Sequence, residues 1–74
     1  MKNKKKLLLD FNQLQALLSA EAFEKYTYTH YAIYVVFTDT GSYFEVNNWL
    51  YNDCVVMICS TLPKLNEYFI KAVI

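Results

Sequence analysis

The sequence predicts a small α+β domain with the element order α-β-β-β-α, in which two helices pack on a three-stranded antiparallel sheet. Three observations lead to this fold class. Apolar side chains recur at helical spacing near both ends of the chain, β-branched and aromatic residues dominate two segments between them, and turn residues separate those segments. The 74 residues suffice for one domain. We expect a basic disordered tail over residues 1–6 and the single domain over residues 7–74.

The first helix is predicted to begin at Asp10 and to end near Lys25. Asp10 and Gln13 match a variant of the capping box, and Leu9 and Leu14 are spaced as a hydrophobic staple. The apolar residues that recur at helical spacing, and that we expect in the core, are Phe11, Leu14, Leu17, Leu18 and Ala22.

A β-hairpin is predicted next, with strands over residues 31–37 and 43–46. Gly41 tolerates a positive φ angle, so we expect a four-residue loop over Thr38–Gly41 with the glycine at its end. Side chains alternate along a strand, so the length of the loop decides which residues share a face. An even-numbered loop gives a core-facing row made of Ile33, Val35, Phe37, Phe44 and Val46.

The opposite face of this hairpin is rich in tyrosine and is the predicted partner-binding site. Five of the seven tyrosines lie between residues 26 and 46. Tyrosine combines a large contact area with a polar tip and few rotatable bonds, and it is enriched at recognition surfaces. The predicted partner-binding residues are Tyr26, Tyr28, His30, Tyr34, Tyr43 and Glu45.

The segment Cys54–Cys59 reads CVVMIC and is predicted to be a strand that is covered on both faces. At an uncovered sheet edge the same strand would invite pairing with another chain. Its two cysteines lie roughly 16 Å apart along the strand, beyond disulfide reach, so we expect buried free thiols. We also expect Trp49 in the core, and the strands over residues 31–37 and 54–59 to be better buried than the strand over residues 43–47.

The last helix is predicted to begin after Thr61, because Pro63 is favoured in a first helical turn, and to run to the C-terminus. Glu67 and Lys71 are spaced for an i,i+4 ion pair. The apolar stripe of this helix consists of Leu62, Leu65, Phe69, Ala72 and Val73.

The formal net charge is zero, but its distribution is uneven. The first six residues carry four lysines, whereas the rest of the chain has three lysines against seven carboxylates. The absence of arginine removes bidentate recognition of phosphate. Frequent Lys, Asn, Ile and Tyr are typical of AT-rich coding, as in low-GC bacteria and their phages. The apolar run Leu7–Leu9 is too short for a secretion signal or a membrane span, so we expect a protein in the cytoplasm of a bacterial host.

No residue pattern carries a recognisable chemistry, and we predict no enzyme, no cofactor and no metal site. A single glycine excludes phosphate-binding and dinucleotide-binding loops. One histidine and two cysteines fall short of the four ligands of a zinc site.

We therefore predict a small non-enzymatic protein-binding module, namely a phage or mobile-element inhibitor of a bacterial host protein, of the anti-defence or anti-CRISPR type. It would act by occluding a surface of its target. A second hypothesis, compatible with the first, is a homodimer that buries its apolar strand or aromatic face. A third is an accessory protein that binds single-stranded nucleic acid through Tyr28, Tyr34, Tyr43 and the lysine tail, although the acidic body argues against it.

Overall fold

The computed structural model describes residues 4–72. Within this range it contains four strands and three α-helices, so the α+β class and the antiparallel sheet are confirmed, while the predicted three strands and two helices are wrong. Val73 and residues 1–3 of the predicted tail lie outside the described residues. In chain order the elements are β1 (Lys5–Leu8), α1 (Phe11–Leu17), α2 (Ala20–Tyr26), β2 (Tyr31–Thr38), β3 (Gly41–Asn48), the 3-10 helix η1 (Trp49–Tyr51), β4 (Cys54–Cys59), α3 (Leu62–Glu67) and the π-helical turn η2 (Tyr68–Ala72).

The additional strand, β1, is formed by the end of the lysine run and the leucines that follow it. It pairs antiparallel with β2, with Lys5 opposite Phe37 and Leu8 opposite Tyr34. Four residues are too few to show an alternating pattern, and a lysine run is typical of solvated chain. A short, charged strand is nevertheless well suited to a sheet edge, where it needs only backbone hydrogen bonds on one side.

The predicted first helix is two helices, because Leu18 adopts an extended conformation between them. Ser19 then begins α2: its side chain accepts a hydrogen bond from the backbone amide of Ala22 at 3.2 Å. The backbone amide of Ser19 donates to Oδ1 of Asn66 at 2.6 Å, which ties the start of α2 to α3. The predicted capping box at the start of α1 is confirmed, with Asp10 and Gln13 each accepting from the other's backbone amide at 2.8 and 2.9 Å.

The register of the β2–β3 hairpin has the predicted parity but a shorter loop. Ile33 lies opposite Val46 and Val35 opposite Phe44, so these four members of the predicted core-facing row are confirmed, whereas the fifth, Phe37, is exposed and lies outside the core. Thr38 and Gly41 pair with each other, which leaves a loop of two residues rather than four. Gly41 has a φ angle of +145°, a conformation that side-chain-bearing residues rarely adopt.

The sheet order is β1-β2-β3-β4, which makes β3 a central strand and β4 an edge strand. The predicted burial of these two strands is therefore wrong. Three consecutive residues of β3, Glu45 to Asn47, are buried, whereas Val55 and Ile58 of β4 are 47% and 57% exposed. An apolar segment predicts a strand, but its composition does not reveal whether neighbours flank it on one side or both.

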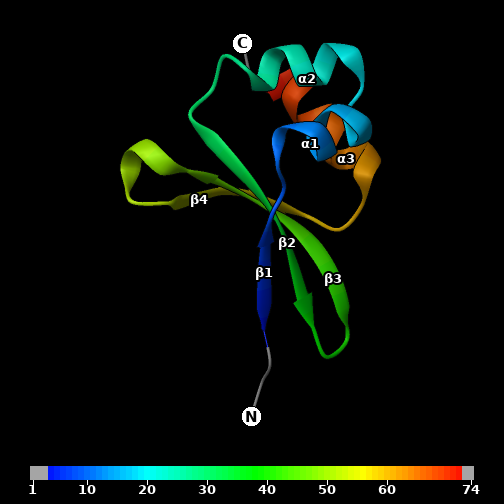
Figure 1. The fold of residues 1–74 in the computed structure, drawn as a ribbon, viewed down its shortest axis with the longest axis vertical. Coiled ribbons are helices and arrows are strands. Elements are labelled where there is room, and N and C mark those ends of the chain that lie inside the picture. The colour runs from blue at the N-terminus through cyan, green and yellow to red at the C-terminus, as the bar shows by residue number, and fades with distance from the viewer. Residues whose placement is uncertain (1–3, 73–74) are drawn as a thin grey trace.

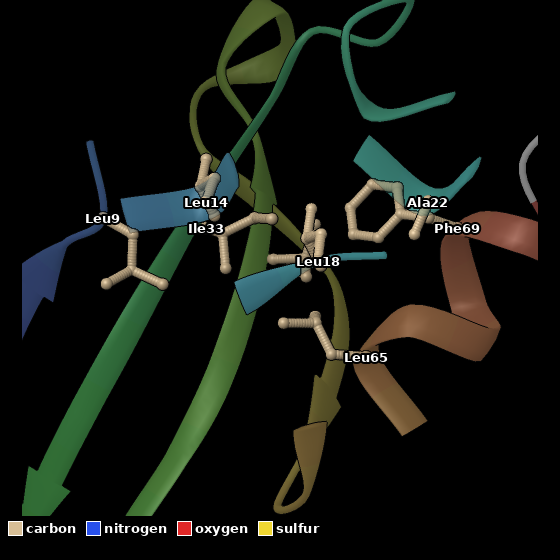
Figure 2. Close-up of a cluster of buried hydrophobic side chains, with 8 residues drawn as sticks. Leu9, Leu14, Leu18, Ala22, Ile33, Leu65 and Phe69 are labelled. Atoms are coloured by element: carbon tan, nitrogen blue, oxygen red, sulfur yellow. The ribbon is translucent and has the colours of Figure 1, made fainter. Parts of the chain in front are cut away.

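The hydrophobic core forms where the helices meet one face of the sheet (Figure 2). Its buried members are Leu9, Leu14, Leu18, Ala22, Ile33, Val46, Leu65 and Phe69. The three α-helices gather at one end of the molecule, and the β2–β3 loop and the N-terminal end of β1 point away from them (Figure 1). The helices consequently leave Leu7 and Phe37 uncovered, at 49% and 43% exposure.

Candidate functional site

Exposed apolar side chains concentrate in the β3–β4 connection and in β4. Of the ten large hydrophobic residues that are exposed among residues 4–72, five lie between residues 49 and 58. They form two neighbouring features. We call η1, with Trp49, Leu50 and Tyr51, the tip, and the free side of β4, with Val55 and Ile58, the β4 edge. Concentrated exposed apolar surface marks sites of interaction in small proteins.

The tip is held in a defined conformation although its side chains face solvent. The Asn48 side chain accepts a hydrogen bond from the backbone amide of Leu50 at 3.0 Å and caps the 3-10 turn. The backbone amide of Trp49 donates to the His30 carbonyl at 3.0 Å, and its indole meets the His30 ring edge to face, with centroids 5.1 Å apart. The turn ends with Asn52 and Asp53, both left-handed at φ 56°.

Trp49 is 54% exposed, so its predicted place in the core is wrong. The physical reason is the 3-10 turn, which ends the alternation of β3 at Asn48 and turns the three following side chains outward. Polar turn residues on both sides of the segment, Asn48 before it and Asn52-Asp53 after it, were the available sequence signal for an exposed loop.

The predicted tyrosine face exists in part, but two of its residues, Tyr34 and Glu45, already contact Lys6 of the same chain. Tyr34, Tyr43 and Glu45 alternate with the core-facing residues and lie on the sheet face that points away from the core, here called the outer face. Lys6 Nζ donates to Glu45 Oε2 at 3.0 Å and also lies 4.6 Å from the centroid of the Tyr34 ring. Val36, which pairs with Lys6 and with Tyr43, is fully buried beneath this group.

The other predicted partner-binding residues lie elsewhere. Tyr26 is in α2, and its ring packs against Phe69 of the core, with centroids 5.9 Å apart, so its assignment to the sheet face is wrong. Burial raises the pKa of the Tyr26 phenol above its usual value. Tyr28 is 77% exposed in the turn after α2, and the exposed His30 contacts the tip through Trp49. The structure thus divides the predicted set among the core, the outer face and the surroundings of the tip.

The β4 edge has an open backbone side, because among residues 4–72 β4 pairs with β3 alone. A groove of about 370 Å³ runs between β4 and the C-terminal helices, lined by Met57, Cys59, Lys64, Glu67, Tyr68 and Lys71, with Ile58 and Ala72. No lysine or proline interrupts the strand, whereas Lys5 and Lys6 protect the opposite edge.

Both cysteines of β4 are free thiols within the described structure, but the prediction that both are buried is wrong. Cys54 is exposed, and Cys59 is half-buried beside the groove. Burial raises the pKa of the Cys59 thiol, which makes it a poorer nucleophile at neutral pH. Burial and the neighbouring Tyr31 raise the pKa of Tyr68, which also lines the groove, to about 12.

Within residues 4–72, no three histidine, cysteine, aspartate or glutamate side chains gather as metal ligands would. None of the helices in this part of the chain has the length and apolar character needed to cross a bilayer. The described residues do offer two exposed apolar features, the tip and the β4 edge. Comparison with protein-family models, with curated proteins and with solved structures finds no match to this chain.

Proposed function

We propose that this chain is a small non-enzymatic protein-binding module whose tip inserts into a pocket or groove of another protein. The observation that carries the proposal is the exposed side chain of Trp49, which is fixed in place by His30. Tryptophan and tyrosine are among the residue types most enriched at binding hot spots, and the tip presents one of each beside a leucine.

The local structure of the tip supports this role. The capped 3-10 turn and the bond from Trp49 to His30 hold the backbone before any partner arrives, so less conformational entropy is lost on binding. Polar residues at both ends of the turn, Asn48 and Asp53, form a rim around the apolar centre. Such a rim excludes water from a buried anchor.

The biological setting that we propose is that of a phage or mobile-element inhibitor that occludes a surface of a bacterial host protein. Its support is compositional: a short chain, no arginine, and seven carboxylates against three lysines after residue 6. An acidic body of this kind is suited to a basic target surface. Binding of single-stranded nucleic acid through the outer face is not favoured, since Lys6 already lies over the Tyr34 ring and Glu45 adds negative charge there.

The test is affinity capture of partners from a bacterial lysate by the tagged chain, with Trp49→Ala and Tyr51→Ala as the tip variants. Leu7→Ala is the matched control, because Leu7 is exposed to a similar degree, at 49%, but lies in β1 at the other edge of the sheet. We expect a protein that the wild type and Leu7→Ala retain and that Trp49→Ala loses.

The dissociation constants of the purified partner for the wild type and for Trp49→Ala then decide whether Trp49 is a hot spot. Loss of a hot-spot side chain costs about 2 kcal/mol or more, which corresponds to roughly thirty-fold weaker binding by Trp49→Ala. Circular dichroism spectra of the variants should match the wild type, because the tip lies outside the core. Equal affinity of Trp49→Ala and wild type for every captured partner would exclude the tip as the binding surface.

A further inference from the structure

We propose that β4 pairs antiparallel with β4 of a second copy of this chain, around a two-fold axis that passes between Val56 and Met57. The two four-stranded sheets then join into one sheet of eight strands. This interface uses the β4 edge and not the tip, so it is independent of the function proposed above.

A β-bulge sets the order in which the side chains of β4 point to the two faces of the sheet. Val46 pairs with Met57 but the next residue, Asn47, pairs with Val55, so Val56 is the additional residue on β4. As a result, Val56 and Met57, which are neighbours in sequence, both pack toward the core. A regular strand would place neighbours on opposite faces.

The bulge makes the pattern of faces symmetric. Cys59 also packs toward the core, and Cys54 lies on that same side, because its partner Asn48 pairs with the core-packed Tyr31. Val55 and Ile58 pair with Asn47 and Glu45 and therefore lie on the outer face. Along Cys54–Cys59 the faces thus run inner, outer, inner, inner, outer, inner, an order that is the same in both directions.

Directly opposite residues of an antiparallel pair lie on the same face of the sheet. A two-fold axis between Val56 and Met57 satisfies this condition at all six positions of β4. It places Cys54 opposite Cys59 of the second copy and Val55 opposite Ile58 of the second copy. Val55 and Ile58, which are 47% and 57% exposed, then cover each other. A shift of one residue would place inner-face residues opposite outer-face ones.

Charge complementarity also favours a second copy as the occupant. In this register the residue before Cys54 of the second copy, Asp53, lies opposite Ser60. The exposed Lys64 lines the groove together with Cys59, the neighbour of Ser60. The acidic residue of one chain therefore approaches the basic residue of the other, and the two-fold axis repeats this pair. The strand itself brings no charge into the interface.

Thiol cross-linking tests the register directly. Opposite Cβ atoms in an antiparallel pair are about 5 Å apart, whereas two copies of the same cysteine would be roughly 16 Å apart in this arrangement. We treat the wild type, Cys54→Ser, Cys59→Ser and an equal mixture of the two variants with dibromobimane, which bridges thiols a few ångströms apart. We expect covalent dimers from the wild type and from the mixture, and none from either variant alone.

Sedimentation equilibrium at about 100 μM, well above a micromolar Kd, supplies the second readout. We expect about twice the 8.7 kDa chain mass for the wild type, for Trp49→Ala and for Leu7→Lys, which adds a charge at the other edge. Ile58→Lys should be monomeric, with an unchanged circular dichroism spectrum. A monomeric wild type overturns the proposal, and so does a dimer that either cysteine variant cross-links alone or that Trp49→Ala abolishes.

Discussion

Glu45 is a carboxylate that the fold buries, with only 6% of the residue exposed. A buried charge is costly unless it is paired, and here the partner is the ammonium group of Lys6, 3.0 Å away. The aliphatic stem of Lys6 also helps to cover Val36, because the two residues lie opposite each other in the β1–β2 pair. One lysine of the N-terminal run is therefore a structural residue.

We expect Lys6→Met to lower the free energy of unfolding by about 1–3 kcal/mol, because it leaves the Glu45 carboxylate buried and unpaired while keeping an apolar stem. The matched control is Lys71→Met. Lys71 pairs with Glu67 at 3.1 Å, but both side chains are largely exposed, so we expect a change below about 0.5 kcal/mol. Urea unfolding at neutral pH measures the stability of both variants. Equal losses would show that the Lys6–Glu45 pair stabilises the fold no more than the exposed Lys71–Glu67 pair.

At the scale of elements, the two-residue β2–β3 loop depends on the backbone conformation of Gly41. A Cβ atom built there meets no other described atom within 4 Å, so the constraint on this position is its φ angle of +145° and not its surroundings. The residue closes the hairpin opposite Thr38, whose hydroxyl donates to the Gly41 carbonyl at 3.0 Å.

We expect Gly41→Ala to lower the free energy of unfolding by about 1–3 kcal/mol through backbone strain alone. Asp39→Ala, in the same loop and exposed, is the control and should stay within about 0.5 kcal/mol of the wild type. Chemical denaturation of the three proteins is the measurement. A Gly41→Ala variant as stable as the control would mean that the loop relaxes to another turn at no cost.

The sequence predicted those elements whose signals are local. The capping box at Asp10 and the alternation around Ile33 and Val46 are patterns of a few neighbouring residues that predict local structure, and both are confirmed. Strand order is a long-range property, so the apolar character of Cys54–Cys59 could not show that β4 lies at an edge. The short strand at Lys5 and the break at Ser19 depend on partners distant in sequence, β2 and Asn66.

The candidate site could be predicted only in part, for the same reason. Tyr34 and Tyr43 share a sheet face, as the strand period requires. Tyr26 does not, because α2 continues through it and its half-buried ring packs against the core. The exposure of Trp49 escaped prediction, since a tryptophan is on average a buried residue and only its flanking turn residues indicated otherwise.

At the scale of the whole molecule, stability should depend on alkaline pH through two half-buried phenols, those of Tyr68 and Tyr26. The pKa of Tyr68 is raised to about 12, first by burial and then by Tyr31, and burial also raises the pKa of Tyr26. A raised pKa in the folded state means that the neutral phenol is favoured there. This stabilisation is fully present below the unfolded-state value of about 10 and is lost as the pH rises towards 12.

We therefore expect the free energy of unfolding to fall between pH 10 and about pH 12. Tyr68→Phe cannot ionise at this position, so its stability should fall less over the same range. Denaturant unfolding across this pH range, with absorbance of the phenolate as a second signal, measures both proteins. Parallel curves for Tyr68→Phe and wild type would contradict the assignment of this pH dependence to Tyr68.

The two edges of the sheet differ in how well they resist pairing with another strand, and this difference limits how many chains can assemble. Amyloid-like stacking needs a strand that accepts neighbours on both sides, or a sheet with two open edges. β1 is only four residues long and carries Lys5 and Lys6, whose like charges would face each other if the β1 edges of two copies came together. Once β4 is paired with β4 of a second copy, only the lysine-bearing β1 edges remain at the two ends of the joined sheet. The chain can therefore keep one strand that pairs with another copy without polymerising into fibrils.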